Sequence, residues 1–112
     1  METSDWTDRI RTFAEEREWQ QFHTPKNLAM ALSVEASELV EIFQWLTPEE
    51  SAAIMSTDRG QAVRDEVADI MTYLLRFADV LGIDLDAAMS AKTESTAKRY
   101  TIENSQGSSA KR

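Results

Sequence analysis

The sequence contains no cysteine and only one histidine, three glycines and two prolines among its 112 residues. The absence of cysteine excludes disulfides and thiolate metal sites, and it is compatible with the reducing cytoplasm, where we expect the protein to reside. A single histidine, His23, cannot supply the imidazole cluster that would recruit zinc. The few glycines and prolines stand where helices are expected to begin or end, and no segment alternates as a strand does.

Long apolar runs and an excess of basic charge are also lacking. No apolar stretch approaches the roughly 20 residues of a membrane span, and the first ten residues resemble no signal peptide, so we expect neither feature. The formal net charge is −8. Such acidity disfavours binding to nucleic-acid phosphates. If the ligand is itself a polyphosphate, a divalent cation is needed to invert the local field.

Capping signals divide the chain into helices and predict an all-α fold. We expect helices over about residues 5–18, 25–45, 48–55, 59–81 and 85–103, capped by Ser4, Thr24, Thr47, Asp58 and Asp84 in that order. Gly82 suits the C-terminal end of the fourth helix. The length suggests one domain, which we place at residues 1–104, followed by a flexible polar tail over 105–112.

The two long helices carry apolar seams with the same alternating spacing of three and four residues. The seam of the first of them consists of Leu28, Leu32, Glu35, Leu39, Ile42 and Leu46. The seam of the second consists of Val63, Val67, Ile70, Leu74, Phe77 and Leu81. Seams of this kind are typical of nearly antiparallel helices, which predicts a four- to five-helix bundle.

Four carboxylates stand on or beside these seams. Glu35 occupies a position where a leucine belongs, and an isolated buried carboxylate requires a cation, a hydrogen-bond network or a proton. Glu38 follows one turn later, and Glu66 and Asp69 repeat the same spacing on the facing helix. Two such pairs can surround one Mg²⁺ or Mn²⁺ ion. The alternative is that these acidic pairs are ordinary solvated surface, as most such pairs on helices are.

The same residues resemble those of a known family. Glu35-x-x-Glu38, a gap of 27 residues and Glu66-x-x-Asp69 are similar to the acidic motifs of the MazG-like nucleotide pyrophosphohydrolases, in the all-α NTP pyrophosphatase superfamily. The stretch EREWQQFHTPKNLAMALSVEASELVEIFQW at 16–45 looks like the dCTP pyrophosphatase branch. DEVADIMTYLL at 65–75 is similar to the second acidic motif, and the resemblance covers roughly residues 6–100.

The resemblance implies a helical bundle completed by dimerisation, assembled as a homodimer or as a homotetramer built from dimers. It also implies Mg²⁺-dependent cleavage of a nucleoside triphosphate between the α and β phosphorus, which yields a monophosphate and pyrophosphate and clears surplus nucleotides. The matching metal ligands are Glu35, Glu38, Glu66 and Asp69. The favoured substrate is dCTP or a related deoxynucleotide.

Several further residues match positions of the family's substrate pocket. Trp19, Trp45 and Tyr73 match aromatic positions of the base and sugar pocket, although both tryptophans could instead belong to the core or to a dimer interface. His23 could be a ligand contact or a hydrogen-bonding core residue. The candidate phosphate contacts are Lys26, Lys92 and Arg99. Thr96 stands where the family has asparagine, which is a departure that bears on substrate preference.

The expected mechanism is attack on the α-phosphorus by a water activated by Mg²⁺, with the catalytic pair Glu38 and Glu35. Glu38 is expected to orient or deprotonate the water. The first alternative is a non-catalytic helical-bundle interaction module, which explains the seams but not Glu35 within one. The second is a pyrophosphohydrolase of a histidine-pathway nucleotide, against which the tryptophans of the base pocket argue.

Overall fold

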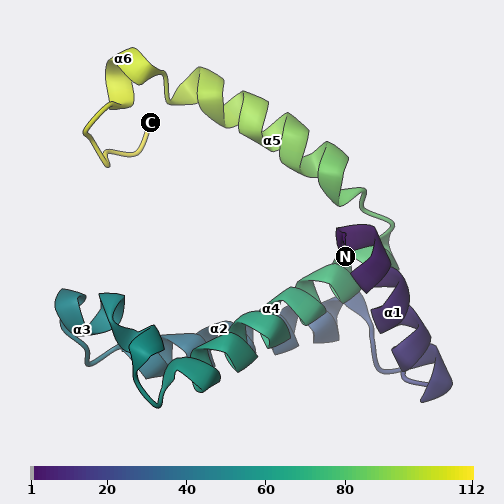
Figure 1. The fold of residues 1–112 in the computed structure, drawn as a ribbon. Helices are drawn as coiled ribbons and strands as arrows, with labels where there is room; N and C mark the ends of the chain where they lie inside the picture. Colours follow the sequence, from purple (N-terminus) through teal and green to yellow (C-terminus); the bar gives the residue numbers. More distant parts are fainter. Residues whose placement is uncertain (1) are drawn as a thin grey trace. The chain divides into compact units, whose positions relative to one another are not determined.

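The computed structural model of the protein describes residues 2–112. Over that range it consists of six α-helices and one 3-10 helix, with no strand (Figure 1). The elements are α1 (Thr3–Glu16), α2 (Pro25–Phe43), α3 (Pro48–Ala52), η1 (Ile54–Ser56), α4 (Gly60–Leu81), α5 (Leu85–Arg99) and α6 (Ile102–Ser105). The all-α prediction is confirmed, and α6 is one helix more than expected.

Side-chain caps begin α2, α3 and α5 as predicted, at Thr24, Thr47 and Asp84. The hydroxyl of Thr24 accepts the backbone N–H of Asn27 at 3.2 Å at the start of α2. At the start of α3, Thr47 and Glu50 each accept the other's backbone N–H, at 3.1 and 2.9 Å. These bonds satisfy N–H groups that the first turn of a helix leaves without partners.

The predicted start of α1 is wrong by two residues. The carboxylate of Asp5 accepts the backbone N–H of Glu2 at 3.0 Å, so the cap is Glu2 and not Ser4. The predicted C-terminal limit of α5 is also too late. The helix ends at Arg99, because Thr101 caps the separate α6 by accepting the N–H of Asn104 at 3.2 Å.

The start of α4 differs from the prediction as well, because Asp58 does not cap it. The 3-10 turn η1 leads into Thr57, whose hydroxyl accepts the N–H of Arg59 at 3.2 Å. The helix then begins at Gly60, where a Cβ would lie 3.1 Å from the carbonyl oxygen of Met55. This close approach explains a glycine in the first turn of the helix.

The chain forms two compact units, and the boundary between them in the sequence lies between Gly82 and Ile83. In the first unit α1 and α2 both pack against α4. The side chain of Arg59 donates to the carbonyl of Ile42 at 2.8 Å, so the start of α4 lies at the end of α2, and the two helices run antiparallel (Figure 1). The second unit contains α5 and α6. The predicted domain limit at residue 104 and the flexibility of the tail stay predictions.

The face that α4 turns toward α2 is shifted from the predicted seam. Val67 and Leu74 are 53% and 38% exposed, although both were expected in the core. The less exposed side chains of this face recur every three or four residues, namely Val63, Glu66, Ile70, Tyr73 and Phe77. Glu66, which is absent from the predicted seam, therefore lies within the seam that faces α2. The seam of α2 is as predicted, with Leu28 buried and its other members half-buried.

None of the helices in the described chain combines the length and the apolar character that a membrane crossing requires.

Candidate active site

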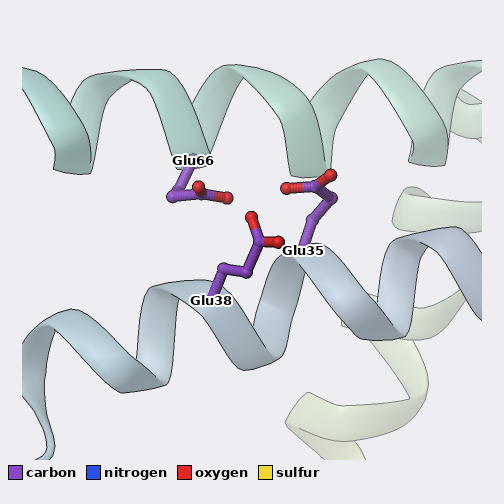
Figure 2. A group of neighbouring side chains, drawn as sticks. All are labelled: Glu35, Glu38 and Glu66. Atoms are coloured by element: carbon purple, nitrogen blue, oxygen red, sulfur yellow. The ribbon is translucent and has the colours of Figure 1, made fainter.

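Three carboxylates meet between α2 and α4. Glu35 and Glu38 project from successive turns of α2, and Glu66 projects from α4 toward them (Figure 2). Each offers one oxygen, and these three oxygens lie within 4.8 Å of one another. The antiparallel packing of the two seams brings them together, because both helices carry a glutamate at a position that faces the other helix.

Two oxygens of this cluster have no hydrogen-bond partner within residues 2–112. They are Oε2 of Glu35 and Oε2 of Glu66, and both are buried. Proton sharing with Glu35, together with burial, raises the pKa of Glu66 to about 7. The pKa of Glu35 is also raised: a hydrogen bond with the carboxyl of Glu66 lowers it, but burial and the neighbouring Glu38 outweigh that effect. Clustered oxygens that lack donors fit a hard divalent cation such as Mg²⁺ or Mn²⁺.

A cavity of about 330 Å³ adjoins this cluster. Its lining joins α1, the connection from α1 to α2, and both long helices, through Ile10, Trp19, His23, Glu35, Asp69, Thr72, Tyr73 and Arg76. Glu35 belongs to both the carboxylate cluster and the cavity lining. The volume is at the lower end of the range of about 300–1,000 Å³ that small-molecule pockets occupy.

Five of the predicted site residues line this cavity, namely Trp19, His23, Glu35, Asp69 and Tyr73. Asp69 is exposed and, among the described carboxylates, does not join the group of three whose oxygens lie within 4.8 Å. The structure thus places three of the four predicted metal ligands together, with Asp69 one turn further along α4.

The histidine of the cavity is fixed by contacts on two sides. Nδ1 of His23 accepts a hydrogen bond from Nε of Arg76 at 3.0 Å. The ring of Trp19 meets the imidazole edge to face, with centroids 6.0 Å apart, and meets Phe13 in the same way at 5.6 Å. Burial, and after it the positive charge of Arg76, lowers the pKa of His23. The imidazole is therefore neutral at pH 7.

Other predicted contacts lie elsewhere on the chain. Lys26, in the first turn of α2, is exposed and does not line the cavity. Trp45 is 86% exposed, which excludes the core role considered for it, and it does not line the cavity either. Lys92 and Arg99 lie on α5, in the second unit. There Lys92 and Thr96 line a shallow hollow of about 310 Å³.

Sequence reasoning missed Ile10, Thr72 and Arg76 in the cavity lining. The helical spacing offered a signal for two of them, since Thr72 and Arg76 follow Asp69 by three and seven residues and lie on the same side of the helix. Arg76 was not considered because an arginine in an amphipathic helix is most often solvated.

A comparison with protein-family models decides the family. The model described as the MazG-like family matches residues 30–112, which include all four predicted metal ligands. The chain belongs to the MazG-like family. The family resemblance predicted from the acidic motifs is confirmed.

Individual relatives of this MazG-like chain carry consistent names. It is 40% identical over 100 residues to dCTP pyrophosphatase 1 of Bos taurus and 38% identical over 100 residues to that of Homo sapiens. Each match covers 88% of this chain and 59% of the relative, so the chain spans about three fifths of their length. A pyrophosphatase of known structure from Archaeoglobus fulgidus shares 37% identity, with a TM-score of 0.81 over 88% of this chain and 91% of that one.

Proposed function

We propose that this MazG-like chain is a nucleoside triphosphate pyrophosphohydrolase that converts a nucleoside triphosphate to a monophosphate and pyrophosphate. One observation carries the proposal. Glu35 belongs both to a cluster of carboxylates with orphaned oxygens and to the wall of a ligand-sized cavity. A cation held by the cluster and a nucleoside held in the cavity would then lie on either side of Glu35. The phosphates of the substrate would lie between them.

The cluster suits Mg²⁺, with Mn²⁺ as a substitute. Glu35, Glu38 and Glu66 would hold it, and Asp69 would take part from the next turn of α4. When bound, such an ion supplies neutralisation of phosphate charge and acidification of water. Glu38 is the exposed member of the cluster, so its carboxylate is free to orient the attacking water and accept its proton. Cleavage then depends mainly on positioning and electrostatics, and no covalent nucleophile is required.

The substrate that we favour is dCTP or a closely related deoxynucleotide. Two relatives bear the name dCTP pyrophosphatase 1 at about 40% identity. Trp19 and Tyr73 line the cavity and offer aromatic faces to a base and a sugar. The contributions of Lys26, Trp45, Lys92 and Arg99 to substrate binding belong to the same proposal, as does the effect of Thr96.

The position of the label after hydrolysis in ¹⁸O-water tests the reaction. The eight common nucleoside triphosphates are incubated with the protein and Mg²⁺, and the products are analysed by mass spectrometry. Attack on the α-phosphorus places the label in the monophosphate and leaves pyrophosphate unlabelled. Label in pyrophosphate would move the attack to the β-phosphorus, and release of diphosphate and phosphate would contradict the proposed reaction.

A further inference from the structure

Arg76 is the most buried charged side chain of the described chain, with 6% of its surface exposed. It lies on α4 and lines the cavity without belonging to the carboxylate cluster. Its guanidinium makes two contacts of different kinds. Nη1 donates to Oδ2 of Asp79 at 3.2 Å, and Nε donates to Nδ1 of His23 at 3.0 Å.

The first contact fixes the guanidinium itself. Asp79 lies one turn further along α4 and is also held by Arg11 of α1, through two hydrogen bonds of 2.8 and 2.6 Å. A planar guanidinium that is itself buried and bonded to a half-buried carboxylate has little freedom to rotate. Its Nε–H therefore points in a fixed direction, toward the segment between α1 and α2 that carries His23.

The second contact determines which nitrogen of the imidazole carries the proton. A neutral imidazole has one donor nitrogen and one acceptor nitrogen, and the partner of one nitrogen sets the character of the other. Arginine can only donate. Since Nδ1 of His23 must accept from Arg76, the proton of the neutral ring resides on Nε2. Within residues 2–112 the structure gives Nε2 no hydrogen-bond partner.

We infer that Arg76 is a positioning residue that fixes His23 in the Nε2–H tautomer, so that the cavity presents a constant hydrogen-bond donor to an acceptor atom of the nucleotide. This inference rests on the proposed function only for the identity of the ligand. The acceptor would be an oxygen or an unprotonated nitrogen of the bound nucleoside. A group that is itself a donor would be rejected at this point, because two donors would face each other.

The lowered pKa of His23 supports this picture independently of the tautomer. Burial and the charge of Arg76 both disfavour the imidazolium. A second donor on Nδ1 would also face the Nε–H of Arg76, which has no acceptor to offer. Both effects favour the neutral ring with its donor at Nε2.

A single histidine makes the test direct, because His23 gives the only imidazole signals of the chain. The protein is prepared without a histidine tag, and long-range ¹H–¹⁵N correlation spectra of the imidazole are recorded across neutral pH. We expect a protonated Nε2 and an unprotonated Nδ1 in the wild type. In R76M, we expect averaging of the two tautomers and a higher midpoint of titration. A protonated Nδ1 in the wild type would overturn the inference, whether or not the protein hydrolyses nucleotides.

Two further variants separate positioning from charge and from general stability. R11M removes an ion pair of Asp79 without touching His23, and we expect it to leave the tautomer unchanged. R76K retains the charge but loses the planar fork, and we expect it to behave as R76M does. If R11M disturbed the imidazole tautomer as much as R76M does, the hydrogen bond from Arg76 to His23 would have only a structural role. If R76K showed the wild-type tautomer and titration midpoint, the positive charge at position 76 would be sufficient to fix the imidazole.

A kinetic cycle measures the consequence for binding. We expect R76M to raise KM about tenfold, with a much smaller change in kcat, because a contact to the bound nucleoside is lost. In an H23A background, R76M should add little, because both substitutions remove the same donor. Multiplicative effects in the double variant would mean that Arg76 acts on the substrate by another route, and would overturn the inference. If none of these proteins, the wild type included, released pyrophosphate, the proposed function would instead be contradicted.

Discussion

Arg11 on α1 and Asp79 on α4 form an ion pair through two parallel hydrogen bonds, Nε to Oδ2 at 2.8 Å and Nη2 to Oδ1 at 2.6 Å. The same carboxylate accepts from Arg76 at 3.2 Å. These contacts hold α1 against the C-terminal half of α4, beside the cavity. The Arg11 hydrogen bonds outweigh the effect of burial and lower the pKa of Asp79.

Replacement of Asp79 with asparagine is expected to destabilise the fold. The variant leaves Arg76 without its carboxylate and leaves Arg11 only its contact with the exposed Asp8, and hydrogen bonds to charged groups contribute about 1.5–3 kcal/mol each. We expect a loss of about 2 kcal/mol in the free energy of unfolding, measured by urea denaturation. The wild type should also lose this stabilisation as the pH falls through the lowered pKa of Asp79, since that group favours the folded state only when ionised.

The matched control is Asp8→Asn. Asp8 pairs with the same Arg11 at 3.3 Å, but 69% of its side chain is exposed. Exposed pairs contribute little, so the control should lose less than about 0.5 kcal/mol. Equal losses in the two variants would show that the lower exposure of Asp79 adds nothing.

The carboxylate cluster predicts the opposite pH dependence in the absence of metal. The pKa of Glu66 is raised to about 7 by the adjacent Glu35 and by burial, whereas the unfolded chain has the ordinary value of about 4.5. Between these values the folded state holds a proton that the unfolded state has released, so stability should fall as the pH rises from about 5 to about 7. Urea denaturation in a chelator measures this slope, and Glu66→Gln should flatten it. A slope that survives unchanged in the variant would assign it to another group.

Divalent metal should stabilise the protein through Glu35. Without metal, Glu35→Leu is expected to raise the melting temperature, because it removes a carboxylate from the apolar seam. With Mg²⁺ or Mn²⁺ the wild type should gain stability by mass action, whereas Glu35→Leu and Glu35→Gln should gain little and should lose turnover. Thermal melts with and without metal provide the measurement.

The control for metal binding is Glu41→Gln, an exposed carboxylate on α2 outside the cluster. It should respond to metal as the wild type does. If Glu35→Leu retains full turnover, Glu35 does not hold the catalytic metal. If the wild type itself releases no pyrophosphate and Glu35→Leu is only more stable, the chain is a non-catalytic helical module and Glu35 is a tolerated polar residue.

Asp69 is expected to matter for turnover more than for stability. It is exposed and lines the cavity beside Glu35, so Asp69→Asn keeps the shape of the side chain and removes its charge. We expect turnover to fall by about a hundredfold or more, on the order of 3 kcal/mol of transition-state stabilisation. Pyrophosphate release measures turnover, and an unchanged urea midpoint shows that the fold is retained. A fall in turnover of only about tenfold would show that Asp69 is not a metal ligand.

The exposed apolar side chains of α4 predict self-association. Val67 and Met71 are 53% and 51% exposed, one turn apart on the face that α2 does not cover. An apolar stripe of this kind marks an interaction surface. We expect light scattering at micromolar concentration to give a dimer or a tetramer rather than the 12.7 kDa monomer. Met71→Glu should lower the mass, whereas Gln61→Glu, at the start of the same helix, should not.

The sequence was sufficient for those parts of the fold that depend on local chemistry. Thr24 and Thr47 cap helices as predicted because a cap needs only residues three positions away. The face of α4 was misassigned because two seams of equal spacing run along it, one through Val67 and one through Glu66. Only packing against α2 decides which of them is internal.

In the candidate site too, contacts within one helix were predictable and contacts between distant residues were not. The pairing of Glu35 with Glu38 follows from one helical turn, whereas the contact of Arg76 with His23 joins residues 53 positions apart. That contact arises because the segment after α1 folds back over α4, and periodicity within one helix carries no information about it. Sequence patterns therefore revealed the carboxylates but not the hydrogen bond from Arg76 to His23.

The carboxylates on the two sides of the α2–α4 contact also bear on how fast the chain folds. Docking of these helices brings like charges together although 27 residues separate Glu38 from Glu66, before any ligand can bind between them. If the contact is formed in the transition state, repulsion slows refolding of the metal-free chain. A divalent cation then accelerates refolding, and mild acid does the same by protonating Glu66. The availability of metal would thus govern how long a newly synthesised chain remains without the α2–α4 contact.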